Sequence, residues 1–160
     1  MIKVDQTIVS GSDEGAQGNC LQAVVASLFE LELEEVPHFI MSDTWYTDMA
    51  KFYSDMGKMF MEAQEFEIMN VEHNGDIDGM REALEHDGGI GGYWGATVKS
   101  QTFEGKYHAV VIDRDMNIVH DPNPNRKSLK LGPGDLVSIT TVKPDWYFNT
   151  EGKLIILNTT

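Results

Sequence analysis

The sequence predicts an α+β fold in which N-terminal helices pack on a C-terminal antiparallel β-sheet. Two observations support this prediction. Apolar residues recur at helical spacing in the part of the chain that precedes Gly88. After Gly88 the pattern changes to short runs rich in β-branched and aromatic residues, separated by turn-like stretches such as DRDM, PNPN and GPGD. Helices that precede strands along a chain are typical of α+β proteins.

The first helix is predicted over 19–30. Its apolar residues share the i, i+3, i+4 spacing of one helix face: Leu21, Val24, Val25, Leu28 and Phe29. Asn19 stands at the N-cap position. The stretch SGSDEGAQG before it is polar and glycine-rich, as loops are. Cys20 is therefore predicted in the first turn of a helix that follows a loop.

Two further helices are predicted, over 44–63 and 76–87. The first carries a stripe of Met and aromatic residues, which is far more often protein core than a cofactor site: Trp45, Met49, Phe52, Tyr53, Met56, Met59 and Phe60. The second is short, and Gly88 is placed to end it. Strand-like runs are IKVDQTIV near the N-terminus and, after Gly88, IGGYWGAT, KYHAVVI, NIVHD, LVSITTV and KLIIL.

Length, charge and cysteine content narrow the class of protein. A chain of 160 residues is long enough to bury one core, so we expect one domain over 1–160. The net charge of −14 disfavours nucleic-acid and membrane partners, because it repels phosphate groups. A single cysteine cannot form an intramolecular disulfide, and no stretch resembles a signal peptide or a membrane span. These features favour a reducing cytoplasm and leave the oligomeric state open.

Cys20 is the candidate nucleophile. A lone cysteine is most often a small buried hydrophobe, and this reading remains an alternative. At the start of a helix, however, exposed backbone N–H groups and the helix dipole stabilise a thiolate and lower the thiol pKa. A thiolate in that position needs a proton acceptor.

His108 is the candidate base among five histidines. It opens the apolar run HAVVI, a strand expected to be buried on both faces, where an unpaired imidazole is costly. His73 and His86 lie in settings typical of the surface, and His38 follows a proline in a setting typical of packing.

Asp121 is the candidate partner of His108. The run NIVHD delivers His120 and Asp121, and strand alternation lets one of these two side chains share a face with His108. We favour Asp121, because a carboxylate accepts the imidazole N–H and stabilises imidazolium. A satisfied core pair without catalysis remains an alternative. A metal site is disfavoured because no pair such as HxxxH or CxxC occurs, and we expect no cofactor.

An acyl-transfer nucleophile also needs donors for the oxyanion, and two glutamines upstream of Cys20 qualify. Gln6 lies in the strand-like IKVDQTIV, whereas Gln17 lies in the glycine-rich loop. We favour Gln6, since a rigid element holds geometry better than a loop.

The residues around these candidates resemble a known family. GNCLQAVVASLFELELEEVPHF resembles the opening of small papain-like proteins of bacteriophages and bacteria, and HAVVIDRDMNIVHDPNPN resembles their second block. Both are similar to the bacteriocin-processing, double-glycine peptidase domains of transporters. The resemblance implies a papain-like cysteine peptidase fold with Gln6, Cys20, His108 and Asp121 in the catalytic roles. It also implies a phage-encoded protein that acts in the host cytoplasm.

Three functions fit these features. The leading hypothesis is a thiol hydrolase that cleaves a peptide, isopeptide or related amide bond of a protein or peptide substrate. The second is an acidic binding or inhibitor protein on the same scaffold, and the third is an acyltransferase with the same triad. The glycines of IGGYWG favour either close approach of a substrate backbone, as in cleavage after small residues, or a bend in a strand.

Overall fold

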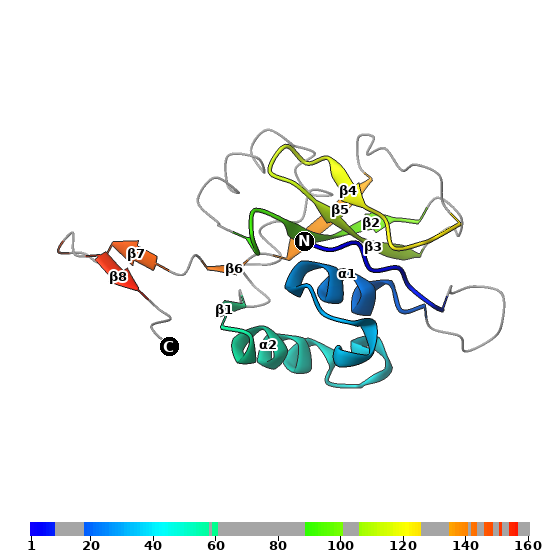
Figure 1. The fold of residues 1–160 in the computed structure, drawn as a ribbon, viewed down its shortest axis with the longest axis horizontal. Helices are drawn as coiled ribbons and strands as arrows, with labels where there is room; N and C mark the ends of the chain where they lie inside the picture. The colour runs from blue at the N-terminus through cyan, green and yellow to red at the C-terminus, as the bar shows by residue number, and fades with distance from the viewer. Residues whose placement is uncertain are drawn as a thin grey trace.

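The chain folds into N-terminal helices followed by antiparallel strands (Figure 1). This computed structural model describes residues 1–8, 18–57, 59–60, 89–100, 106–125, 135–140, 142–143, 146–148, 151 and 154–156. Helix α1 spans Cys20–Phe29 and helix α2 spans Trp45–Asp55. The short 3-10 helices η1 (Leu33–Glu35) and η2 (Phe39–Met41) lie between them. The predicted α+β arrangement is confirmed.

The central sheet is antiparallel and has the strand order β4-β3-β2-β5. Its strands are β2 (Trp94–Lys99), β3 (Tyr107–Ile112), β4 (Ile118–His120) and β5 (Leu136–Thr140). Two short ladders lie outside this sheet. Strand β1 (Met59–Phe60) pairs with β6 (Val142–Lys143), and β7 (Trp146–Phe148) pairs with β8 (Leu154–Ile156).

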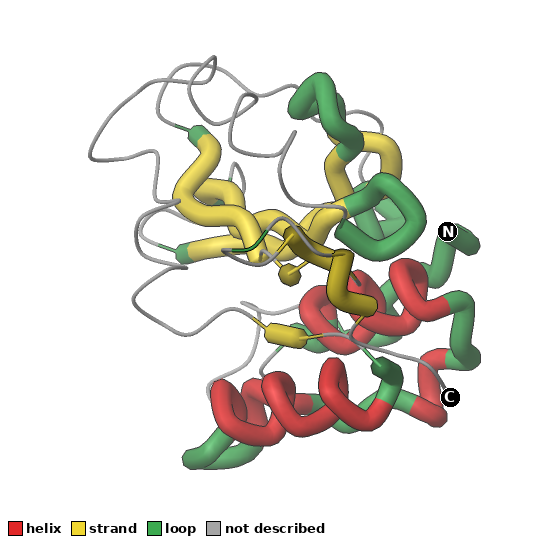
Figure 2. Tube along the Cα trace, turned by 90° about the vertical axis from the view of Figure 1, so that its left-hand side faces the viewer, coloured by secondary structure: helices red, strands yellow, loops and turns green. Residues whose placement is uncertain are grey.

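Helix α1 packs on one face of β3 (Figure 2). Val24 and Leu28 of the helix form a buried cluster with Ala109 and Val111 of the strand. On the neighbouring strand β2, a Cβ atom at Gly95 would lie 3.3 Å from the side chain of Val24 and 3.6 Å from that of Leu28. Gly95 therefore allows the helix to approach the sheet closely.

Two other clusters complete the described core. On β2, β3 and β5, the buried residues Trp94, Ala96, Val98, Val110, Ile112, Leu136 and Ile139 pack together with Met116. The alternation of β3 separates Val110 and Ile112 from the residues that face α1. A third cluster joins α1 to α2 and includes Val25, Phe39, Met49 and Tyr53. Among the described residues, no helix has both the length and the apolar character needed to cross a membrane.

The N-terminal segment 1–8 joins the helix layer to the sheet. The backbone N–H of Ile2 donates to the carbonyl of Ser27 at 3.1 Å, and that of Val4 donates to Ser27 Oγ at 3.0 Å. Farther along, Gln6 N–H donates to the carbonyl of Pro122 at 2.8 Å. The segment is not assigned as a strand, so the strand expected from IKVDQTIV is wrong in its described part. Bonds to α1 and to the end of β4 hold it instead.

Several predicted boundaries differ from the structure. The helix predicted over 44–63 ends at Asp55, because Gly57 has a positive φ of 81°, which is typical of a helix C-terminus, and Met59 and Phe60 form β1. The run LVSITTV is divided between β5 and β6. Strand β7 was not predicted. The helix predicted over 76–87 lies outside the described residues.

The close approach of α1 to β2 can be tested by filling the space at Gly95. A Gly95→Leu substitution should lower the free energy of unfolding by about 1–3 kcal/mol, the usual cost of overpacking a core. Urea denaturation measures this change. Introducing leucine at the exposed Lys99 of the same strand, Lys99→Leu, should change the value by less than about 0.5 kcal/mol. Equal values for the two variants would contradict the packing described.

Candidate active site

Cys20 is the first residue of α1, as predicted, and its side chain is half-buried. The backbone N–H of Leu21, in the first turn of the helix, acts on the Cys20 thiol and lowers its pKa. A second backbone N–H, that of Ala109 on β3, does the same. The sulfur therefore lies between the start of the helix and the edge of the strand, in contact with donors that favour a thiolate.

The short length of β4 explains why Ala109 is available to Cys20. Strand β4 pairs with Val111 and Ile112 of β3, and its pairing does not extend to Ala109. Alternate N–H groups of a strand point to the same side. Asp113 N–H donates to Asn117 on the β4 side at 3.0 Å, so the N–H of Ala109, four residues earlier, points to that same side, where it lowers the pKa of the thiol. The Ala109 N–H can therefore act on the thiol because β4 does not pair with it.

His108 and Asp121 form the hydrogen-bonded pair that the sequence analysis expects. His108 Nε2 lies 2.6 Å from Asp121 Oδ1, and the two side chains are 9% and 11% exposed. The same carboxylate oxygen accepts the backbone N–H of Asn123 at 3.0 Å. The bond from Asn123 closes a tight turn that holds the carboxylate in place, and the carboxylate orients the imidazole.

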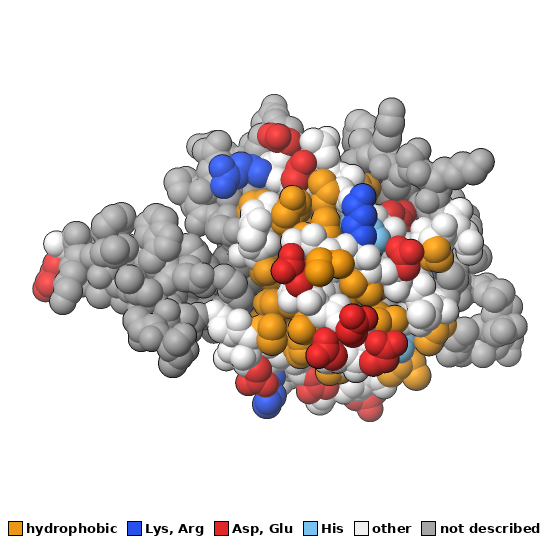
Figure 3. All heavy atoms as spheres, viewed as in Figure 1, with side chains coloured by type: hydrophobic (Ala, Val, Ile, Leu, Met, Phe, Trp, Pro, Cys, Tyr) orange, Lys and Arg blue, Asp and Glu red, His pale blue; other side chains and the backbone are white. Residues whose placement is uncertain are grey.

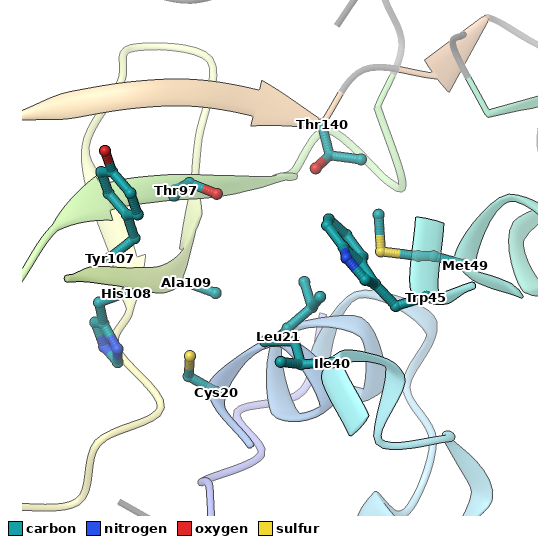
Figure 4. Close-up of a pocket in the computed structure, with 10 residues that line it drawn as sticks. All are labelled: Cys20, Leu21, Ile40, Trp45, Met49, Thr97, Tyr107, His108, Ala109 and Thr140. Carbon is teal, nitrogen blue, oxygen red and sulfur yellow. The ribbon is translucent and has the colours of Figure 1, made fainter. Parts of the chain in front are cut away.

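The imidazole of His108 also interacts with the thiol of Cys20, and this interaction lowers the pKa of the thiol. Because Nε2 is bound to Asp121, Nδ1 is the ring nitrogen left for the sulfur. Figure 4 shows the ring and the sulfur side by side at one end of a cleft. Cys20, His108 and Asp121 therefore form a continuous chain of interacting side chains, with a hydrogen bond between His108 and Asp121.

The electrostatics of this chain favour a thiolate and an imidazolium. Burial acts to raise the pKa of the Cys20 thiol, but the hydrogen bond and charge of His108 and the N–H groups of Ala109 and Leu21 lower it overall. Burial acts to lower the pKa of His108, but its hydrogen bonds and charge interactions with Asp121 and Cys20 raise it to about 9. Both shifts move the proton of the pair from Cys20 toward His108.

His120 points away from this pair. Its Nε2 lies 2.7 Å from the carbonyl oxygen of Val4, with Asp5 Oδ1 at 3.8 Å. The predicted orientation of the two neighbouring side chains is confirmed: Asp121 faces His108, and His120 faces the other side. His38 is half-buried at the start of η2, and His73 and His86 lie outside the described residues. In the described part of the chain, no group of three or more His, Cys, Asp or Glu side chains could hold a metal ion.

Gln6 is buried, but its amide is engaged beside Ile8. Gln6 Nε2 donates to the carbonyl oxygen of Ile8 at 2.8 Å, and Gln6 does not line the cleft next to Cys20. One N–H of this amide is therefore bound to Ile8, and the position of Gln6 beside the sulfur and its oxyanion role stay predictions. Gln17 lies outside the described residues.

Asn19 has a role that the sequence analysis missed. Its side chain makes no capping bond to α1. Instead, Asn19 Oδ1 accepts the backbone N–H groups of Thr7 at 3.0 Å and Ile8 at 2.8 Å, and Nδ2 donates to Thr7 Oγ1 at 3.0 Å. The amide of Leu21 is thereby left to the sulfur. Asparagine before a helix suits either use, so sequence alone could not have distinguished them.

A cleft of about 280 Å³ opens beside the thiol. It lies between the helices and the α1 face of the sheet. Its lining residues are Cys20, Leu21, Ile40, Trp45, Met49, Thr97, Tyr107, His108, Ala109 and Thr140 (Figure 4). The nucleophile candidate and its histidine are thus at the wall of a space that a substrate could enter.

Comparisons with protein-family models, with curated proteins and with solved structures give no match. The chemistry of the site must therefore carry the functional argument.

The activation of Cys20 can be tested by its alkylation rate as a function of pH. Iodoacetamide should react with a midpoint below the ordinary thiol pKa of 9.0, because the thiolate is stabilised. His108→Ala removes the stabilising cation and should raise the midpoint. Asp121→Asn should lower the pKa of His108 from about 9, so the rate change linked to imidazolium deprotonation should move to lower pH. A midpoint at the ordinary thiol pKa in the wild type would indicate that Cys20 only packs in the core and is not activated.

The role of Asn19 can be tested by separating capping from the contact with Thr7 and Ile8. Serine caps helices as well as asparagine does but is too short to reach both amides. We therefore expect Asn19→Ser and Asn19→Ala to lower the free energy of unfolding alike, by about 1–3 kcal/mol, since buried N–H groups lose their acceptor. Asn125→Ala, at an exposed position, is the control. A stable Asn19→Ser variant would assign an ordinary capping role.

Proposed function

We propose that the protein is a papain-like thiol hydrolase that cleaves a peptide, isopeptide or related amide bond through an acyl-enzyme. The observation that carries this proposal is the position of Cys20 beside the hydrogen-bonded pair His108–Asp121, where a thiol with a lowered pKa lies at the wall of a cleft. Pure packing does not require these three groups in contact, and structural cysteines are ordinarily inert.

Each residue has a defined step in the reaction. The Cys20 thiolate attacks the carbonyl carbon, and the carbonyl π electrons move to the oxygen. The tetrahedral intermediate then collapses, the C–N bond breaks, and His108 donates its proton to the departing amine. Water next attacks the thioester while His108 accepts one of its protons, and the thiolate leaves with release of the acid. Asp121 holds the ring in position and stabilises the imidazolium.

The oxyanion needs donors at the start of α1. Backbone N–H groups at a helix N-terminus are suited to that task, since they and the helix dipole favour developing negative charge. The Asn19 side chain, which bonds to Thr7 and Ile8, does not cover them. The second N–H of the Gln6 amide is a further candidate, as the family resemblance implies.

A binding role for the acidic surface remains the second candidate. Acidic side chains gather over the helical part of the face in Figure 3, and Glu30, Glu32, Glu34 and Glu35 are exposed. With a net charge of −14, such a surface suits a basic partner protein. The same triad also supports transfer of the acyl group to an amine. The resemblance to phage proteins and the lone cysteine support action in a reducing cytoplasm, that of a host cell.

The proposal can be tested by digesting a mixture of denatured proteins and reading the new termini by mass spectrometry. Cleavage should disappear in Cys20→Ala, and His108→Ala should lower kcat/KM on any identified substrate by about 10²–10⁴-fold, the range for a general acid–base group. A quenched reaction should carry an acyl mass on Cys20. The control is His38→Ala, which changes a histidine outside the Cys20–His108–Asp121 site and should retain activity. A reactive thiol that yields neither cleavage nor acyl adduct would favour the binding protein, and new amide products would favour transfer.

A further inference from the structure

The cleft beside Cys20 is apolar. Leu21, Ile40, Trp45 and Met49 of the helical layer form one wall, and Thr97 and Thr140 of the sheet lie opposite. In Figure 4 the side chains of Leu21 and Trp45 point into the space next to the sulfur. Among the described lining residues no Asp, Glu, Lys or Arg occurs. This is unexpected for a chain with a net charge of −14.

Large hydrophobic side chains are exposed around the same opening. Ile40 and Trp45 are each 36% exposed and Tyr107 is 59% exposed, and all three line the cleft. Single exposed hydrophobic residues are ordinary on protein surfaces, but a group of them around one cavity indicates a binding site. A group bound there would cover these side chains and lose water from its own apolar surface.

The size of the cleft limits its occupant. At about 280 Å³ it lies just below the range of roughly 300–1,000 Å³ that is usual for small-molecule pockets. One large side chain is therefore a better match than an extended ligand. A lysine or arginine would find no carboxylate among the described lining residues, and burying an unpaired charge is costly.

The glycines of IGGYWG are explained by a turn and do not indicate a narrow substrate channel. Gly91 and Gly92 have φ values of 60° and 84° and form the turn between the bridged residues Ile90 and Tyr93. A Cβ atom on either glycine would meet nothing within 4 Å. Their positive φ is sufficient reason for glycine, as in tight hairpin turns. They give no support to a channel that selects small substrate residues.

We propose that this cleft selects a large, uncharged apolar side chain, such as that of phenylalanine or leucine, close to the amide bond that Cys20 attacks. This inference rests on the proposed function and names its substrate class. Buried apolar area supplies the preference over glycine, and the absence of a carboxylate from the described lining residues supplies the preference over lysine.

The inference can be tested with acetylated dipeptide chloromethyl ketones, whose carbon bonds to the Cys20 sulfur as chloride leaves. Glycine, leucine, phenylalanine or lysine is placed in turn at each of the two residues, with glycine at the other. At one position the rate constant for labelling should be about 10- to 100-fold higher for phenylalanine or leucine than for glycine, as burial of such a side chain predicts. All rates are divided by the iodoacetamide rate of the same protein.

A pair of neighbouring variants supplies the control. Ile40→Asp places a carboxylate in the cleft and should reduce the preference for phenylalanine over lysine at least about tenfold. Met41→Asp adds the same charge at the next residue, which is 63% exposed and does not line the cleft, and should leave the preference unchanged. An equal effect of both variants would overturn the assignment of the cleft.

The remaining outcomes separate the inference from the function on which it rests. Equal labelling by all side chains, or fastest labelling by glycine, with an activated thiol would overturn the inference and leave the hydrolase intact. Faster labelling by a straight-chain alkyl chloromethyl ketone than by any of the peptides would overturn the inference, because it would show that the cleft takes an acyl chain and not a peptide side chain. A thiol no more reactive than an ordinary cysteine would contradict the proposed function itself.

Discussion

The packing of α1 across β3 is the constraint on which the site depends. Val24 and Leu28 lie against Ala109 and Val111, and this contact sets where the helix begins relative to the strand. A shift of one helical turn, about 5.4 Å, would remove the sulfur from both the imidazole and the Ala109 N–H. Apolar contact thus positions the thiol. Little conformational freedom is then left to lose when the thiol meets the imidazole and the Ala109 N–H. The short β4 completes the arrangement, because it leaves the edge of β3 open at this point.

Buried polar groups concentrate at the same junction. The buried polar side chains in the described part of the chain are Gln6, Asn19, Ser27, His108 and His120. Three of them bond to the N-terminal segment from outside it: Asn19 to Ile8, and Ser27 and His120 to Val4. A fourth, Gln6, lies within the segment and bonds to Ile8. The fifth, His108, bonds to Asp121 and lies beside Cys20. Because an unsatisfied buried group is costly, these bonds restrict the segment, the helix and the strands to one arrangement.

Local patterns in the sequence were sufficient for much of this site. The periodicity around Cys20 predicted the helix and its first residue, and strand alternation predicted that Asp121, not His120, would face His108. The rest depends on contacts between distant segments. Gln6 and Asn19 both bond to Ile8, and no local pattern distinguishes that use from an oxyanion donor or a helix cap. The end of α2 was missed because its apolar stripe continues at helical spacing into residues that form β1.

The opposite pKa shifts of His108 and Cys20 also bear on stability. Above 6.5 the folded protein keeps a proton on His108 that the unfolded chain has lost, because the pKa of His108 is raised to about 9. Between the lowered pKa of folded Cys20 and 9.0, the unfolded chain keeps a proton on the thiol that the folded protein has lost. Where these two ranges overlap, the two differences in bound protons offset each other.

The two residues reach this balance from opposite directions. The raised pKa of His108 gives a contribution that is complete below 6.5 and is lost as the pH rises through about 9. The lowered pKa of Cys20 gives one that is present above 9.0 and is lost as the pH falls through the folded value. The two slopes have opposite signs where both apply, so each reduces the dependence of stability on pH that the other alone would cause. Pairing a histidine of raised pKa with a thiol of lowered pKa therefore makes the fold less sensitive to pH than either shift alone would.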